Sequence, residues 1–229
     1  MGAVGLLYVG AVLFINGLML VGAIPGKSAG ILNFFVGGMQ IIFPTLIILG
    51  ADGDQATIFG AAGLYLFGFT YLYVAILQFT GISGEGLGWF SLFVVFCATV
   101  IGVLQFTLVD DPVFGVIWLI WAVLWFLFFL VLGLGKESLT RTTGWFTIFI
   151  SHMTGTIPAF LLLLGEYETT AGYALIVALA AAVSLGVAWI LGHGPDPMSK
   201  ATEPVQSTQS TRSTQSPQST QSPQSTRVA

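Results

Sequence analysis

The stretch IWLIWAVLWFLFFL, residues 117–130, contains no charged side chain and is apolar enough to lie inside a membrane. Trp118, Trp121 and Trp125 recur at intervals of three and four residues, so an α-helix carries all three indoles on one face. Tryptophan in membrane helices is usually enriched at the two interfaces, where its N–H group stays hydrated. An indole face that continues through the middle of a span therefore needs another explanation.

The rest of the chain has the composition of an integral membrane protein. Of its 229 residues, 55% are hydrophobic and 7% are charged, and the mean hydropathy is +0.93. A segment must supply about 20 apolar residues to cross a bilayer as a helix. The segments that meet this requirement are 3–24, 29–50, 57–80, 88–109, 113–134, 144–165 and 171–191. They predict an all-α membrane protein with seven spans.

The distribution of charge predicts the orientation in the cell inner (plasma) membrane. With the N-terminus outside, all six basic residues face the cytoplasm, and the outer loops carry acidic residues without Lys or Arg. This is the positive-inside pattern. The basic residues are Lys27, Lys136, Arg141, Lys200, Arg212 and Arg227. The same orientation makes 193–229 a cytoplasmic tail, and its Pro, Gln, Ser and Thr repeats predict disorder.

A repeat in the even-numbered spans predicts an internal threefold organisation. The second, fourth and sixth spans begin with GILNFF (30–35), GWFSLF (88–93) and GWFTIF (144–149). The second and sixth spans also share a Met and, five residues later, a Pro, namely Met39 and Pro44, and Met153 and Pro158. Periods of this size indicate a repeated structural unit. We interpret residues 1–165 as a six-helix channel core of three repeated two-helix hairpins, which can enclose a path along their common axis.

The seventh span, within 166–192, falls outside this repeat. Small residues recur in it every four positions, a spacing suited to close helix packing. These residues are Ala174, Ala178, Ala182 and Gly186. We expect an accessory helix that packs against the core or against a neighbouring subunit.

The spans contain no Asp, Glu, Lys or Arg, and this excludes several functions. Ion-coupled transporters and proton pumps generally use a charged group within the membrane. A retinal protein needs a lysine in its seventh span, and electron transport needs paired His or Cys ligands. The chain has one cysteine, Cys97, and one mid-span histidine, His152. We therefore expect no enzyme activity, no metal or other cofactor and no nucleic-acid partner.

Two interpretations of the indole face remain open. The three tryptophans can fill a helix interface, as large aromatic side chains often do. They can also form a flat surface along which a planar neutral molecule slides, facing Phe67 and Tyr71 of YLFGFTYLY (65–73). Asn16 also lies in mid-span, where its amide requires a partner, water or a solute.

Several motifs resemble the AmiS/UreI family of membrane channels for urea and short-chain amides. They are LLYVGAVLFINGLMLVG (6–22), LNFFVGGMQ (32–40), YLFGFTYLYVAI (65–76), GLGWFSLFV (86–94), IWLIWAVLWFLFFLVLGLG (117–135) and IPAFLLLLG (157–165). The resemblance covers about residues 1–192. It implies six-helix protomers with one pore each, assembled as homo-hexamers around membrane lipid. Carried over by motif, the pore-lining residues are Leu13, Asn16, Phe67, Tyr71, Trp118, Trp121, Leu124 and Trp125.

The chain departs from the acid-gated urea channels of this family in three features. The loop GADGDQ between the second and third spans is short and lacks histidine, Ile150 stands where that branch has a glutamate, and a seventh span is present. The seventh span and the short loops resemble the AmiS branch, whose genes accompany amidases. The three departures argue against acid gating and make amides at least as suitable a solute as urea.

The sequence thus predicts a passive channel for small neutral amides and urea, with a cytosolic amidase or urease consuming the solute. One alternative is a secondary transporter coupled to protons through His152. Another is a sensor or assembly protein without transport activity.

Overall fold

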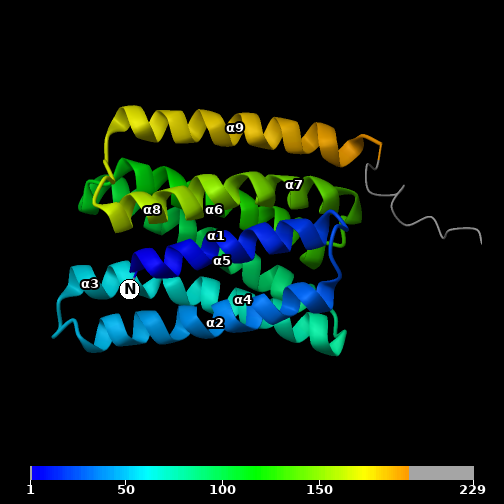
Figure 1. The fold of residues 1–229 in the computed structure, drawn as a ribbon, viewed down its shortest axis with the longest axis horizontal. Coiled ribbons are helices and arrows are strands. Elements are labelled where there is room, and N and C mark those ends of the chain that lie inside the picture. Colours follow the sequence, from blue (N-terminus) through cyan, green and yellow to red (C-terminus); the bar gives the residue numbers. More distant parts are fainter. Residues whose placement is uncertain (1, 196–229) are drawn as a thin grey trace, which may run out of the picture. The chain divides into compact units, whose positions relative to one another are not determined.

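The computed structural model describes residues 2–195, and all regular elements in this range are helices (Figure 1). Seven helical segments are long and apolar enough to cross a membrane, which confirms the predicted fold class. The elements are α1 (Gly2–Leu20), α2 (Gly26–Leu49), α3 (Gln55–Ala62), α4 (Leu64–Thr80), α5 (Glu85–Leu104), η1 (Gln105–Val109), α6 (Pro112–Phe128), η2 (Phe129–Gly133), η3 (Glu137–Leu139), α7 (Thr140–Ile150), η4 (Ser151–Thr156), α8 (Ile157–Leu164) and α9 (Ala171–His193). The predicted tail lies outside the described residues from position 196 onward.

Local sequence accounts for where the helices begin and end. The side chains of Asp54, Asp111 and Thr170 each accept a hydrogen bond from the backbone N–H three residues later, which caps α3, α6 and α9. Gly81 and Gly165 end α4 and α8 in the left-handed conformation, at φ of 72° and 75°. Short turns between capped helices hold neighbouring spans antiparallel.

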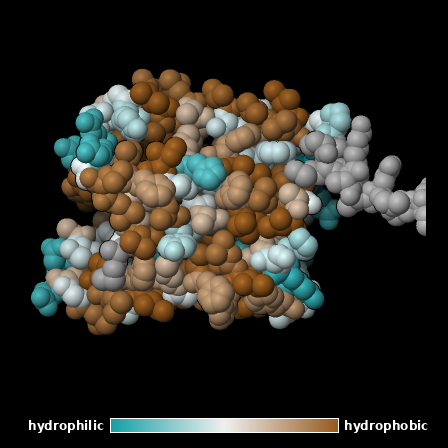
Figure 2. All heavy atoms as spheres, viewed as in Figure 1, coloured by the Kyte–Doolittle hydropathy of each residue, from teal (hydrophilic) through white to brown (hydrophobic). Residues whose placement is uncertain are grey.

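The surface of the helical bundle matches a membrane environment. Figure 2 shows hydrophobic residues over most of the visible face and hydrophilic residues gathered mainly at its two ends. Many large apolar side chains are exposed, as a lipid solvent allows. Among them are Phe35, Phe96, Leu108 and Ile190.

Glycines bring the helices of the core together in three close pairs. Gly37 of α2 lies against the backbone of Leu72 in α4, and Gly88 of α5 lies against that of Gly133 in η2. Gly10 of α1 lies in the same way against the backbone of η4, near Gly155. The second span thus packs on the third, the fourth on the fifth and the sixth on the first. The repeat glycines Gly30, Gly88 and Gly144 lie in the first turns of the second, fourth and sixth spans and contact the ends of these partners.

The seventh span packs on α6 and α7, but through a face that differs from the predicted one. The buried residues of α9 are Ala174, Val177, Ala181 and Ala188. Ala182 and Gly186 are exposed in the single chain, so the whole stripe at four-residue steps is not the face that packs on the core. Its packing against a neighbouring subunit stays a prediction. Four residues exceed one helical turn of 3.6 residues, so a strict four-residue stripe winds around the helix. Alternating steps of three and four residues stay on one face.

Candidate functional site

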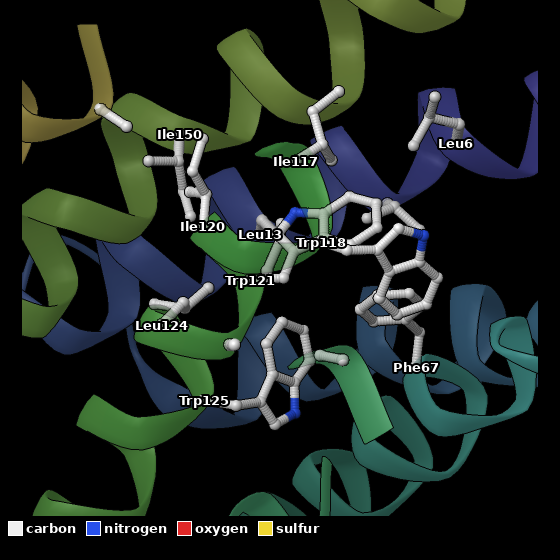
Figure 3. Close-up of a cluster of buried hydrophobic side chains, with 14 of the residues drawn as sticks. Leu6, Leu13, Phe67, Ile117, Trp118, Ile120, Trp121, Leu124, Trp125 and Ile150 are labelled. Carbon is white, nitrogen blue, oxygen red and sulfur yellow. The ribbon is translucent and has the colours of Figure 1, made fainter. Parts of the chain in front are cut away.

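The predicted aromatic residues form one cluster in the middle of the bundle. Phe67 of α4 contacts the indole rings of Trp118, Trp121 and Trp125, with centroid distances of 5.5, 4.8 and 5.0 Å. Phe67, Trp121 and Trp125 are at most 2% exposed. Figure 3 shows Phe67 beside Trp118, with Trp125 on the same side of α6. We call Phe67, Trp121 and Trp125 the aromatic barrier.

Two threonines hold the indoles of the barrier in place. The Trp121 Nε1–H group donates to Thr154 Oγ1 at 3.0 Å, and that of Trp125 donates to Thr70 Oγ1 at 3.3 Å. Each threonine hydroxyl donates in turn to the backbone carbonyl four residues earlier, at 2.7 Å. A hydroxyl has one proton, so this internal bond leaves its lone pairs free to accept from the indole. Both buried indole N–H groups are therefore satisfied.

An irregular helical turn carries Thr154. In η4 the Ile157 N–H group bonds to the carbonyl of His152, five residues earlier. Pro158 follows, and it has no N–H to give to the carbonyl of Thr154. Such π-helical turns are rare and often occur at functional sites. Here the turn places a hydroxyl group directly against the barrier.

A cavity of about 100 Å³ lies on one side of the barrier. Its walls include Leu13, Asn16, Tyr71 and Trp125, so four of the predicted site residues meet there. Polar groups also come from Thr70, Gln78 and Ser91. We call this space the Tyr71 cavity. The Tyr71 hydroxyl is fully buried and has no hydrogen-bond partner within residues 2–195, so it is available to a guest molecule.

A second cavity of about 270 Å³ lies toward the opposite ends of the same helices. It is lined by Leu6 of α1, Leu64 of α4, Gln105 of η1, and Trp118 and Trp121 of α6. We call it the Trp118 cavity. Phe67 lines neither cavity and contacts tryptophans of both. The barrier therefore separates the two spaces.

Asn16 meets a second asparagine, a partner that the sequence reasoning did not identify. Asn16 Nδ2 donates to Asn33 Oδ1 at 3.0 Å, and Asn33 Nδ2 donates to Asn16 Oδ1 at 2.6 Å. Asn33, Ser91 and Thr147 are the fourth residues of the three repeat motifs. Each is buried and donates to the carbonyl four residues earlier. This shared polar position was a signal in the sequence that could have pointed to Asn33.

The predicted site residues are thus placed in different ways. Seven of the eight lie at the barrier or along the two cavities, and Leu124 is fully buried but is not among the residues that line them. Figure 3 shows Leu124 and Ile120 on the side of α6 that faces Ile150. The role of these residues as a pore lining remains a prediction. Sequence reasoning missed Thr70 and Thr154 as the partners of the indoles.

The loop after α8 ties down the start of the helix that carries the tryptophans. The Tyr167 hydroxyl donates to both carboxylate oxygens of Asp111, at 3.0 and 3.1 Å. Burial raises the pKa of Tyr167 above its ordinary value, and the negative charge of Asp111 raises it further. Tyr167 therefore stays a neutral donor near neutral pH. Its ring also packs on Phe114, which borders the Trp118 cavity.

Replacing Thr154 with valine tests the support of Trp121. The change keeps the shape of the side chain and leaves the buried indole N–H without an acceptor, which costs about 1–3 kcal/mol. We expect the free energy of unfolding to fall by about this amount in thermal unfolding of the purified protein. Thr147→Val is the matched control, because Thr147 is equally buried and contacts only its own helix backbone by hydrogen bonding. Equal losses in the two variants would contradict a special role for Thr154.

The fold and the two cavities define a multi-pass α-helical membrane transport protein. The chain belongs to the AmiS/UreI family, because a model described as AmiS/UreI family transporter matches residues 1–166. The members of this family that resemble the chain are transporters and channels, not enzymes. This confirms the family that the motifs indicated.

Individual relatives cover most of the chain. AmiS2 of Rhodococcus erythropolis, named as a transporter, is 58% identical over 191 residues, which are 83% of this chain and 93% of the relative. A protein of Mycolicibacterium smegmatis, named as a transporter of amidate substrates, is 52% identical over 84% of this chain and 91% of its own. The solved structure of the Helicobacter pylori urea channel in its closed state is 33% identical. It matches with a TM-score of 0.66, over 73% of this chain and all of that one.

Proposed function

We propose that the protein is a passive channel for small neutral amides and urea, with a pore of its own in each protomer. The observation that carries this proposal is the pair of cavities separated by the aromatic barrier. Their walls contain no Asp, Glu, Lys, Arg or His, so an ion would find no charge to replace its water shell. Amides and urea are polar but neutral. The names of the relatives, which mention amidate substrates and urea, support the same class of solute.

The barrier suits a planar solute. The faces of Trp121 and Trp125 allow a flat molecule to stack, and their N–H groups are already engaged by threonines. The polar groups of the Tyr71 cavity can replace part of the solute's hydration. Because Phe67 touches both indoles, its side chain must move before a solute can pass. We therefore assign Phe67 as the residue that opens and closes the path.

Charge supports a cellular setting for this channel. We place the N-terminus outside and the tail in the cytoplasm, because Lys27, Lys136 and Arg141 lie at the same end of the spans. The loops on the other side carry Asp52, Asp54, Asp110, Asp111, Glu166 and Glu168. The functional unit is a homo-hexamer, and a cytosolic amidase or urease maintains the inward gradient by consuming the solute. Residues 1–165 form the channel core, with the seventh helix as an accessory element.

Proton coupling is the alternative, and the position of His152 argues against it. His152 is exposed on the outside of the described bundle, contacts Phe14 at a centroid distance of 5.2 Å with the rings tilted, and borders neither cavity. A coupling group must reach the solute or its path. We therefore expect no role for this histidine in transport.

An imposed proton gradient should leave the flux unchanged. In proteoliposomes with a fixed acetamide gradient, the rate of acetamide flux should stay constant when the pH is lowered from roughly 7 to 5. This range is chosen because histidine is the side chain that ordinarily titrates within it. Acetamide accumulation driven by the proton gradient would establish a coupled transporter instead.

The pH range of this assay does not disturb the cap of α3. The hydrogen bond from Thr57 lowers the pKa of Asp54, so the stability that this cap contributes is lost only when the pH falls below the ordinary carboxyl range.

A further inference from the structure

A fully buried amide beside the barrier has no hydrogen-bond partner among the described residues. Gln40 of α2 has no exposed surface, and neither its Nε2 nor its Oε1 atom is bonded. Its backbone carbonyl also lacks the usual helical donor, because Pro44 has no N–H group. Buried amides in proteins are normally satisfied, since unpaired polar groups are costly in apolar surroundings. Such an exception requires an explanation.

Gln40 lies where α2 packs on both α1 and α4. Helix α2 packs on both of these helices, whereas α1 and α4 have little direct backbone contact with each other. A Cβ atom on Gly5 of α1 would lie 2.9 Å from Gln40 Oε1, so this glycine leaves the space that the amide occupies. On the other side, a Cβ atom on Gly68 of α4 would lie 3.0 Å from the Gln40 carbonyl. Gly68 follows Phe67, so Gln40 lies at the level of the aromatic barrier.

The internal repeat gives Gln40 a counterpart that serves the barrier. Gln40 and Thr154 each follow a methionine and precede a proline by four residues, so they occupy the same repeat position. Thr154 contacts the barrier by accepting the N–H of Trp121. Gln40 borders neither cavity, so a solute can reach its amide only when movement of Phe67 opens the barrier. No side chain of the described bundle engages this amide.

We infer that Gln40 is a hydrogen-bonding site for the permeating solute, a small molecule with a primary amide or urea group. The inference rests on the proposed channel function, because it assigns a residue to that same path. A primary amide can pair with the Gln40 side chain through two hydrogen bonds, donating N–H to Oε1 and accepting from Nε2. Asn16 and Asn33 make this two-bond arrangement with each other in the same bundle. Glycerol has hydroxyl groups but no planar amide, so it cannot present this matched pair of N–H and C=O groups.

Gln40→Met tests the assignment, because methionine keeps the length of the side chain and removes both polar atoms. Stopped-flow measurements on proteoliposomes should compare acetamide and glycerol over a range of concentrations. We expect acetamide flux at low concentration to fall about five- to hundredfold, the range of two neutral hydrogen bonds, with a higher half-saturating concentration. Glycerol flux should stay the same, and thermal stability should not fall. The matched control is Thr45→Val, which removes the bond between Thr45 and Tyr65 on the same pair of helices.

The wild-type measurement separates failure of this site from failure of the channel proposal. If the wild type conducts acetamide and Gln40→Met has the wild-type acetamide-to-glycerol ratio, the site is wrong and the channel stands. An equal loss for both solutes would show a structural role and would also overturn the site. Absence of amide flux in the wild type would overturn both proposals. If Gln40→Met does not fold, Gln40→Asn withdraws the amide by one methylene, and an unchanged ratio in that variant overturns the assignment.

Discussion

Replacing Trp125 with alanine should make the channel less selective. The indole contacts Phe67 at a centroid distance of 5.0 Å and borders the Tyr71 cavity, so its removal opens that cavity into the barrier. We expect the glycerol-to-acetamide permeability ratio to rise about tenfold, the scale on which a close-fitting site discriminates between solutes of similar size. Removing a buried aromatic side chain usually lowers the free energy of unfolding by about 3–5 kcal/mol. We expect a loss near the lower end of this range, because one side of the Trp125 ring already faces a cavity.

Trp89→Ala is the matched control for this experiment. Trp89 of α5 is exposed and meets Phe129 in an edge-to-face contact, outside both cavities. Its removal should leave the permeability ratio at the wild-type value. If Trp125→Ala lowers the thermal stability of the assembly without changing the ratio, Trp125 belongs to the packing and does not line the solute path.

Replacing Gly88 with alanine should severely impair folding. A Cβ atom at this position would overlap the backbone of Gly133 and the carbonyl carbon of Leu132. A backbone cannot move aside as a flexible side chain can. Overpacking usually costs about 1–3 kcal/mol and more where no rearrangement is possible. We expect low yield of the assembled protein and a reduced unfolding temperature, measured by size-exclusion chromatography and thermal unfolding in detergent.

Gly38→Ala provides the control of opposite sign. Gly38 also lies within a membrane helix, but a Cβ atom there meets no atom within 4 Å. Alanine stabilises helices relative to glycine by roughly 0.5–1 kcal/mol, so this variant should be as stable as the wild type or slightly more stable. If the two variants behave alike, close backbone contact does not determine how these helices pair.

The features that the sequence predicted correctly depend on short stretches of chain. Seven spans follow from the length and hydropathy of local segments, and the common face of Trp118, Trp121 and Trp125 follows from the helical period. The structure has both features. The family could also be identified, because the motifs around Asn33, Phe67 and Trp125 are continuous in sequence.

The partners of these residues could not be predicted in the same way, because they come from distant parts of the chain. Thr154 is 33 residues from Trp121, and Thr70 is 55 residues from Trp125. Their meeting depends on the π-helical turn η4 and on the glycines that bring helix backbones together, which no local pattern specifies.

The sequence by itself therefore determined the number of spans and the composition of the aromatic face, through hydrophobicity and helical periodicity. The tertiary structure alone decided which helices pair, which face of α9 is buried and which polar atoms remain unpartnered. The physical reason is that a lipid solvent does not distinguish one apolar helix face from another. Helix pairing in a membrane is decided by close packing at glycines and by hydrogen bonds between helices, which depend on the three-dimensional arrangement.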